Sequence, residues 1–328
     1  MLHLQVLEGG GFKLLTRRTL LKGGLALAAG GTLFGGYALA EPFRLRVSRY
    51  EVRPKSWPRG MRLRAAVIAD LHVCEPWMNL ARVHQIVART NALKPDVVLL
   101  LGDFIASHRM TRISGLIPYS HPIPNSDWAK VLKGLKAPLG VHAVLGNHDW
   151  WADDEAQDRR SGPTAVDAAL QDVGIAVYQN DSVRLETEGG GFWLAGLADQ
   201  WALFPPWRAD GQYPPIPYEG LHDLPATLAQ VTDDAPVVLM AHEPDIFAEM
   251  GPLADRVAVT ISGHTHGGQV RLFGYAPVVP SRYGRRFVYG HILDGDRHLV
   301  VSGGLGCSGL PIRFGVPPEI VALDIMGA

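Results

Sequence analysis

Five short apolar runs, each followed by polar residues, constrain the fold of this 328-residue chain more than any other feature. The runs are rich in β-branched residues, and continuous apolar runs of this length are typical of strands that are buried on both faces. They cover residues 63–69, 96–101, 141–145, 236–240 and 257–261. Ligands of open α/β sheets bind beyond the carboxyl ends of the strands, so the residues after these runs are predicted to gather at one edge.

Each run is followed by side chains that can bind a metal ion. The polar segments are Asp70-Leu71-His72, Gly102-Asp103, Gly146-Asn147-His148-Asp149, Ala241-His242-Glu243 and Gly263-His264-Thr265-His266-Gly267-Gly268. Any one of these residues is explained equally well as an N-cap aspartate or a surface histidine. Because the same chemistry follows five strands, it indicates a shared site, and the glycines allow backbone conformations with positive φ beside it.

The order of these motifs resembles the calcineurin-like metallophosphoesterases over residues 63–268, and every metal-binding position of that family is matched. The segment Gly263-His264-Thr265-His266-Gly267-Gly268-Gln269 and three later segments are similar to a bacterial exported or membrane-associated branch. The later segments are Gly304-Leu305-Gly306, Arg313-Phe314 and Pro317-Pro318-Glu319-Ile320. That branch includes twin-arginine-exported phosphodiesterases and enzymes that cleave the pyrophosphate of UDP-2,3-diacylglucosamine. The expected fold is one α/β domain in which two β-sheets pack face to face between outer helices, a four-layer α/β/β/α sandwich.

The polar segments contain too many ligands for one tetrahedral ion and predict two divalent ions. The predicted ligands are Asp70, His72, Asp103, Asn147, His242, His264 and His266. The family resemblance implies that Asp103 bridges the ions, that Asp70, His72 and His266 complete the first site, and that Asn147, His242 and His264 complete the second. Nitrogen and oxygen donors without a thiolate suit manganese, iron or zinc better than calcium or magnesium.

The resemblance also implies hydrolysis of a phosphate ester. Two ions ~3.5–4 Å apart can hold a bridging hydroxide at neutral pH and bind the phosphoryl oxygens for in-line attack. His148 is expected to stay off the metals and to protonate the leaving oxygen or stabilise charge on the phosphate, with Asp149 orienting its ring. Glu243 and Asp199 are candidate hydrogen-bond acceptors for a metal-binding histidine.

Residues 1–40 are predicted to be an export signal that precedes a metallophosphoesterase domain of residues 41–328. The segment Thr16-Arg17-Arg18-Thr19-Leu20-Leu21-Lys22 resembles the twin-arginine motif, and Ala38-Leu39-Ala40 fits a small-x-small cleavage pattern. The uncharged stretch between them has 17 residues, of which six are glycine. A spanning helix needs about 20 apolar residues, so export to the periplasm is favoured over an uncleaved anchor.

Periodicity predicts the elements between the motifs. Residues 78–93, 128–135 and 164–173 are predicted helices, and residues 175–178, 182–186 and 192–198 are predicted strands of a second sheet. Arg44, Arg46 and Arg49 alternate with apolar residues, which predicts an edge strand. Its basic strip is interpreted either as a contact with the membrane surface or as a solvated face.

The sequence leaves the substrate open between a general phosphodiester and a lipid-linked pyrophosphate. Arginines 282, 285, 286 and 313 could pair with a second phosphate, although a surface or structural role is favoured for each of them. The aromatic segment 199–218 is either a platform for an acyl or aromatic group or a packed loop. The export signal argues against the lipid pyrophosphate, since such a precursor is normally found on the cytoplasmic face. A non-catalytic scaffold is the alternative from another class, although the complete ligand set argues against it.

The sequence bears on nucleic-acid binding but not on disulfide formation or oligomeric state. A net charge of −1 predicts no nucleic-acid partner. Whether Cys74 and Cys307 form a disulfide, and which oligomeric state the chain adopts, are not determined by the sequence.

Overall fold

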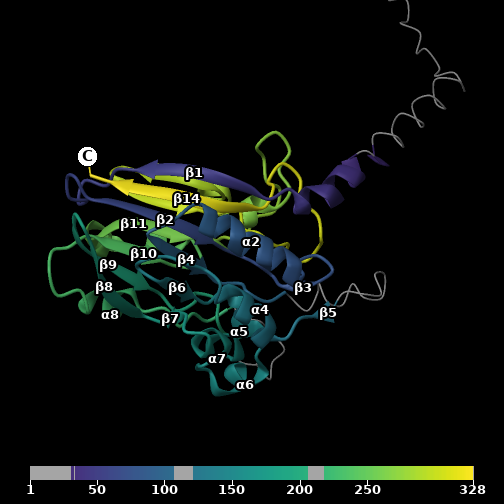
Figure 1. The fold of residues 1–328 in the computed structure, drawn as a ribbon, viewed down its shortest axis with the longest axis horizontal. Coiled ribbons are helices and arrows are strands. Elements are labelled where there is room, and N and C mark those ends of the chain that lie inside the picture. The colour runs from purple at the N-terminus through teal and green to yellow at the C-terminus, as the bar shows by residue number, and fades with distance from the viewer. Residues whose placement is uncertain (1–30, 33, 107–120, 206–217, 328) are drawn as a thin grey trace, which may run out of the picture.

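The structure, a computed structural model, describes residues 31–32, 34–106, 121–205 and 218–327 (Figure 1). Most of the predicted export signal and most of the aromatic segment 199–218 therefore lie outside the described residues. Within the described part of the chain, no helix is both long enough and apolar enough to cross a membrane.

The first sheet has six strands in the order β1-β14-β2-β4-β6-β7. Their bounds are Arg46–Val52 for β1, Glu319–Met326 for β14, Arg62–Ile68 for β2, Val97–Leu101 for β4, Val141–Val144 for β6 and Ala176–Tyr178 for β7. β2, β4 and β6 run parallel, so their carboxyl ends lie at one edge. The predicted edge strand is confirmed as β1, and its Arg46 donates to Tyr289 and to the buried carboxylate of Glu319.

The second sheet has six strands in the order β12-β13-β11-β10-β9-β8. Their bounds are Gly290–Asp294 for β12, Arg297–Val301 for β13, Val257–Ser262 for β11, Val237–Met240 for β10, Gly190–Gly196 for β9 and Asp181–Thr187 for β8. The assignment of residues 175–178 to this sheet is wrong, because β7 pairs with β6 of the first sheet. Asn180 has a φ of 69°, and the chain turns there from one sheet into the other, which the alternation of apolar residues cannot reveal.

Helices cover the outer face of each sheet. The predicted helices are confirmed as α2 (Leu80–Ala92), α4 (Asn125–Leu132) and α7 (Ala165–Asp172), which share an apolar core with the first sheet. The second sheet shares an apolar core with α8 (Leu224–Ala229) and α9 (Ile246–Glu249). Side chains alternate as a buried strand requires: Leu63 and Val67 of β2 face the other sheet, and Ala66 and Ile68 face the helices. The layers follow the order helix, sheet, sheet, helix, which confirms the predicted four-layer sandwich (Figure 1).

Short elements complete the described chain. They are β3 (Cys74–Glu75), β5 (His121–Pro122), α5 (Asn147–Trp151), α6 (Asp154–Arg159), η1 (Glu41–Phe43), η3 (Gly251–Arg256), η4 (His266–Gly268) and η5 (Gly284–Phe287).

The N-terminal helix of the described chain, within residues 31–40, touches the domain through aromatic contacts. The ring of Phe34 stacks on Phe314 with centroids 4.4 Å apart, and Tyr37 meets the same ring edge-on. The backbone N–H of Arg313 donates to the carbonyl of Ala38, a buried residue. Residues just before the predicted cleavage site therefore pack against the fold.

Cys74 and Cys307 lie together in a small buried cluster and are free thiols in the structure.

Candidate metal centre

The predicted metal ligands converge at the carboxyl ends of strands from both sheets. β2, β4 and β6 supply ligands from the first sheet, and β10 and β11 supply ligands from the second. All seven side chains are buried, with none more than 5% exposed. The structure therefore brings together every residue predicted as a ligand.

Five of these residues adopt backbone conformations that non-glycine residues rarely take. Asp70, His72, Asp103, His264 and His266 have φ values between 47° and 66°. This left-handed region costs roughly 1–2 kcal/mol for a residue with a Cβ, and such outliers cluster at functional sites. The turns after the strands are thus held in unfavourable conformations that direct these side chains toward one another.

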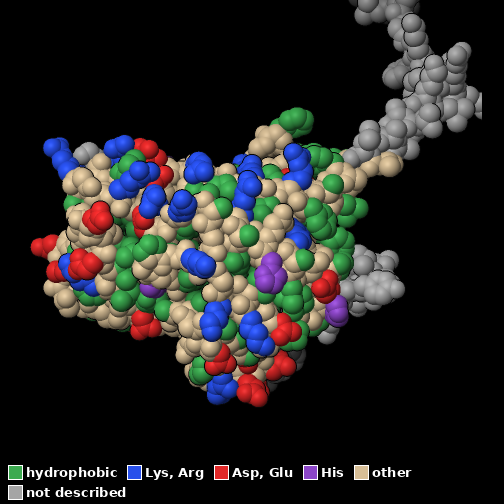
Figure 2. All heavy atoms as spheres, in the orientation of Figure 1, with side chains coloured by type: hydrophobic (Ala, Val, Ile, Leu, Met, Phe, Trp, Pro, Cys, Tyr) green, Lys and Arg blue, Asp and Glu red, His purple; other side chains and the backbone are tan. Residues whose placement is uncertain are grey.

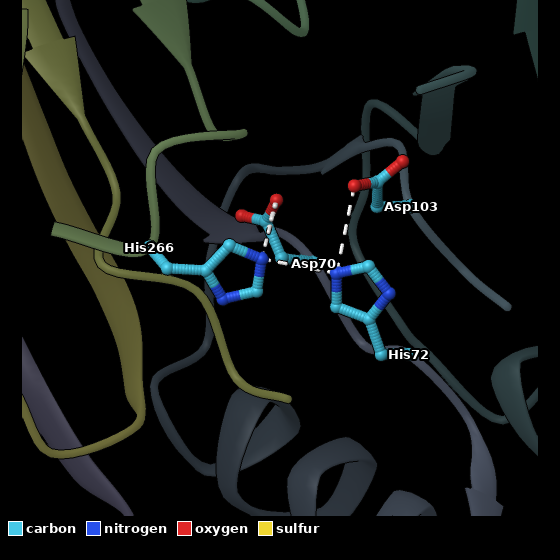
Figure 3. Close-up of side chains that lie close together, drawn as sticks. All are labelled: Asp70, His72, Asp103 and His266. Atoms are coloured by element: carbon cyan, nitrogen blue, oxygen red, sulfur yellow. Dashed lines mark hydrogen bonds and ion pairs between the residues drawn. The ribbon is translucent and has the colours of Figure 1, made fainter. Parts of the chain in front are cut away.

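The first group consists of Asp70, His72, Asp103 and His266, whose potential ligand atoms all lie within 4.8 Å of one another (Figure 3). His72 Nε2 is 3.0 Å from His266 Nε2 and 3.5 Å from Asp103 Oδ2. His266 Nε2 is 3.7 Å from Asp70 Oδ1. Two imidazoles and two carboxylates that converge on one point form a donor set suited to a divalent transition metal.

The second group shares Asp103 with the first. His242 Nε2 lies 3.3 Å from the same Oδ2 atom of Asp103 that faces His72. His264 Nδ1 is 2.9 Å from Asn147 Oδ1 and 3.3 Å from His242 Nε2. One carboxylate oxygen thus stands between two clusters of nitrogen and oxygen donors.

Backbone carbonyls orient two of the imidazoles. Nδ1 of His72 lies 2.9 Å from the Ile105 carbonyl, and Nδ1 of His242 lies 2.6 Å from the Leu101 carbonyl. Since Nδ1–H donates in both rings, both Nε2 atoms are directed into the centre, the orientation that metal binding requires. Glu243 was the candidate acceptor for His242, but the acceptor in the structure is the carbonyl of Leu101. Oε2 of Glu243 accepts instead from the backbone N–H of Gln200.

The electrostatics of the ligands fit a site for cations. Burial, together with the charge of Asp103, raises the pKa of Asp70 to about 7. Burial acts in the same direction on Asp103, but His242 and His148 outweigh it and hold the pKa of Asp103 well below its usual range. Burial lowers the pKa of His264 to about 4, so this ring is neutral and able to bind a metal at pH 7.

Two buried ligand atoms have no hydrogen-bond partner among the described residues. These atoms are Asp70 Oδ2 and His264 Nε2. An unpaired buried polar atom is costly, and for a carboxylate oxygen a bound cation removes that cost. The chemistry of the donor set and the orphaned carboxylate oxygen both fit divalent metal ions.

The carboxylate of Asp149 lies between two turns of the centre. Its carboxylate accepts hydrogen bonds from the backbone N–H groups of Asp103, Phe104, Ile105 and Gly146, at 2.8 to 3.3 Å. These bonds join the turn after β4 to the turn after β6. Asp149 therefore fixes the position of Asp103.

His148 lies beside the ligands and lines an open cavity. Its ring centroid is 5.0 Å from that of His72 in an edge-on arrangement, and its Nε2 atom is 3.5 Å from Ser308 Oγ. Its backbone N–H donates to Asp103 Oδ1 at 2.9 Å. The ring is thus held next to both ligand groups without belonging to either.

The arginines predicted to bind a second phosphate do not line this cavity. Arg313 is fully buried and donates to three backbone carbonyls, with Nη2 also 3.2 Å from Nδ1 of His266. Arg282 and Arg286 pair with acidic side chains, and Arg285 lies over the ring of Tyr275. Arg313 is therefore a structural arginine, the alternative that the sequence favoured, because a guanidinium enclosed by carbonyls cannot reach a substrate.

The cavity beside the ligands has a volume of about 900 Å³ and walls that are mainly aromatic and aliphatic. Tyr218 stacks on Trp151 and Trp201 at centroid distances of 4.5 and 5.4 Å. Trp201 in turn meets His264 edge-on at 4.8 Å. The described ends of the segment 199–218 thus form an aromatic wall next to the metal ligands.

The sequence motifs did not reveal the supporting residues of the opposite wall. Gln269 Oε1 accepts from the backbone of Ser308 at 2.7 Å, and both residues line the cavity. Gln269 directly follows the Gly-His-x-His-Gly-Gly motif, which is the only signal that could have indicated it. Ser308 has no signal in the sequence, because tertiary structure alone brings it to His148.

Comparison with known proteins agrees with this geometry. The sequence profile of the calcineurin-like phosphoesterases matches residues 63–268. An uncharacterized metallophosphoesterase of Bacillus subtilis, YkuE, is 30% identical over 95% of this chain and 98% of its own length. Phosphodiesterase YaeI of Escherichia coli is 27% identical over 95% of this chain and all of its own length. The protein is therefore a metallophosphoesterase that belongs to the calcineurin-like phosphoesterase family.

Proposed function

We propose that the protein is a phosphodiesterase that uses two divalent metal ions. The observation that carries this proposal is Asp103 Oδ2, which faces His72 of one ligand group and His242 of the other. A carboxylate shared between two donor clusters is the arrangement that a dinuclear site requires. The name of the YaeI relative supports a diester as the substrate class.

In this proposal Asp70, His72, Asp103 and His266 hold the first ion, and Asp103, Asn147, His242 and His264 hold the second. When bound, two such ions supply a water-derived nucleophile and neutralise charge on the phosphoryl oxygens. His148 faces the cavity, where it can give a proton to the leaving oxygen. Asp149 keeps Asp103 in place through the backbone bonds described above.

Metal analysis combined with hydrolysis assays tests the proposal. The purified protein is expected to contain about two metal ions per chain and to hydrolyse bis-p-nitrophenyl phosphate faster than p-nitrophenyl phosphate. Manganese, iron and zinc are each added to metal-stripped protein to identify the ion that restores turnover. Absence of bound metal and of turnover with every metal would favour a non-catalytic scaffold.

A lipid-linked phosphoester is the second candidate substrate, and the character of the cavity favours it. The cavity has aromatic and aliphatic walls, and no lysine or arginine of the described chain lines it. An acyl or aromatic group fits such walls, whereas among the described lining residues a second phosphate finds no guanidinium or ammonium partner. Tyr218→Ala is expected to raise KM for a diester with a long acyl chain and to leave KM for dimethyl phosphate unchanged.

We also propose that residues 1–40 direct export by the twin-arginine route, which would place the enzyme outside the cytoplasm. The support is the Arg17-Arg18 pair, the weakly apolar stretch and the Ala38-Leu39-Ala40 pattern. Replacement of both arginines by lysine is expected to retain the protein in the cytoplasmic fraction, while the unsubstituted chain is recovered outside it. Mass spectrometry of the exported chain tests cleavage after Ala40.

A further inference from the structure

A hairpin at the rim of the cavity exposes large apolar side chains. Leu272, Phe273, Tyr275 and Val278 are exposed, and Phe273 is fully so. The base of the hairpin lines the cavity through Val270 and Pro277. In Figure 1 the yellow-green segment that follows β11 rises above the sheets, and Figure 2 shows hydrophobic atoms at the tip of this projection.

The conformation of the tip makes the presence of phenylalanine unexpected. Leu272 and Tyr275 exchange two backbone hydrogen bonds of 2.9 Å across a two-residue turn. Both central residues have positive φ, 51° at Phe273 and 83° at Gly274, as in a type I′ turn. Such turns favour Asn-Gly, and a bulky residue is disfavoured at the first position. Phe273 gains nothing from packing there, so its side chain has no role in stabilising the turn.

In the sequence, the charged side chains of the hairpin and of the segments next to it are all positive. Residues 257–293 contain four arginines and no aspartate or glutamate. Arg282 and Arg286 pair with Glu249 and Asp294, but in the described chain Arg271 and Arg285 contact only a carbonyl and aromatic rings. Two arginines without a carboxylate partner therefore flank an exposed aromatic tip.

We propose that the hairpin of residues 271–278, hereafter the rim hairpin, docks on the surface of an anionic phospholipid bilayer. Aromatic side chains favour the boundary between headgroups and acyl chains, and arginines beside them bind anionic headgroups. A narrow tip can enter a fluid bilayer without a complementary surface, whereas a stable protein partner needs about 800 Å² of matching area on each side.

Two neighbouring features are consistent with this docking surface. Phe34 stacks on Phe314, and the carbonyl of Phe314 accepts a hydrogen bond from the backbone N–H of Arg271 at 2.7 Å, so the described part of the N-terminal helix lies beside the rim hairpin. Phe34 and Leu39 of that helix are also exposed. Docking at this end of the molecule brings the cavity rim, with Val278 and Leu310, to the lipid surface.

Vesicle sedimentation of the full chain tests the proposal. Phe273→Asp removes the apolar tip and suits a positive φ, and Leu293→Asp changes an equally apolar, exposed residue on the edge strand β12. With vesicles of phosphatidylglycerol and phosphatidylcholine, Phe273→Asp is expected to weaken partitioning about tenfold or more, and Leu293→Asp to leave it unchanged. Vesicles of phosphatidylcholine alone, or high salt, are expected to weaken binding of the unsubstituted chain.

A fluorescent label measures insertion separately from total binding. Both native cysteines are buried, so a label attaches selectively to Phe273→Cys or to the control Leu293→Cys. A blue shift with anionic vesicles at position 273 and not at 293 supports insertion. Unchanged emission at 273 combined with normal partitioning of Phe273→Asp overturns the proposal. Loss of self-association in Phe273→Asp without a change in vesicle binding also overturns it, in favour of a second copy of the chain.

The proposal does not depend on the proposed activity, because vesicle binding is measured without turnover. Phe273 lies outside the cavity lining, so Phe273→Asp is expected to hydrolyse soluble bis-p-nitrophenyl phosphate at the unsubstituted rate. Failure of hydrolysis in every variant would affect the proposed function alone.

Discussion

Arg313 Nη2 lies 3.2 Å from Nδ1 of His266, inside a fully buried cage of backbone carbonyls. A guanidinium has only donors, so Nδ1 of His266 accepts and the proton of the neutral ring is on Nε2. That proton faces Nε2 of His72 at 3.0 Å, and a metal ion bound at Nε2 of His266 would have to displace it. Arg313 thus orients a metal ligand from behind, while its other N–H groups hold the segment 303–316 in place.

Arg313→Met is expected to lower both stability and metal content. The carbonyls of Gly303, Gly306 and Val316 would lose their donor, at a total cost of about 3–5 kcal/mol. Urea unfolding and elemental analysis measure the two effects. Arg62→Met is the matched control, since its exposed ion pair with Asp324 contributes at most about 1 kcal/mol. Equal stability of the two variants would contradict the structural role of Arg313.

His148→Ala is expected to reduce kcat for bis-p-nitrophenyl phosphate by about 10²–10⁴-fold, because a proton donor to the leaving oxygen is lost. The metal content is expected to stay at the unsubstituted level, since His148 belongs to neither ligand group. His84→Ala, on the exposed face of α2, is the control. Retained turnover in His148→Ala would remove His148 from the chemistry.

Gly102→Ala is expected to disrupt the centre through the backbone. Gly102 has a φ of 84°, and a Cβ there would meet the backbone nitrogen of Gly146 at 2.4 Å. Gly174→Ala is a close control, because Gly174 has a φ of 83° and no atom within 4 Å of the added Cβ. Both variants lose about 1 kcal/mol from the strained φ, and Gly102→Ala loses a further ~1–3 kcal/mol from overpacking.

Metal content separates these two glycine variants. The turn at Gly102 leads directly into Asp103, so a shift of the backbone there displaces the shared ligand. Gly102→Ala is expected to lose bound metal, and Gly174→Ala to retain it. If both variants keep metal equally, the close approach of the two turns is not required for the site.

Metal affinity is expected to fall as pH falls below about 7. The pKa of Asp70 is raised to about 7 by burial and by Asp103, so in acid the metal must displace a proton from this carboxyl. Protonation of one ligand weakens affinity about tenfold per pH unit below its pKa. Calorimetric titration of metal-stripped protein in buffers from about pH 8 to about pH 5 measures the slope. An affinity that is independent of pH over this range would contradict the assignment of Asp70 as a ligand.

The sequence by itself predicted the four-layer fold and the residues that meet at the metal centre. The five apolar runs ending at Asp70, Asp103, Asn147, His242 and His264 predict that these residues gather beyond the strand ends, and the resemblance of their order to the calcineurin-like metallophosphoesterases supplies the four-layer fold and the two-ion ligand set. Helices such as α2 were visible from their 3.6-residue period. These features are local or follow directly from local order.

Only the tertiary structure decided the sheet of β7, the roles of Asp149 and Arg313, and the character of the cavity. Alternation along a strand shows which faces are buried but not which strand lies next to it, so residues 176–178 were placed in the wrong sheet. A carboxylate or guanidinium binds whichever groups the fold brings near. Asp149 accepts from backbone N–H groups, and Arg313 donates to backbone carbonyls. Those partners are contributed by turns far apart in the chain, and their distances are set by packing, which no local pattern records.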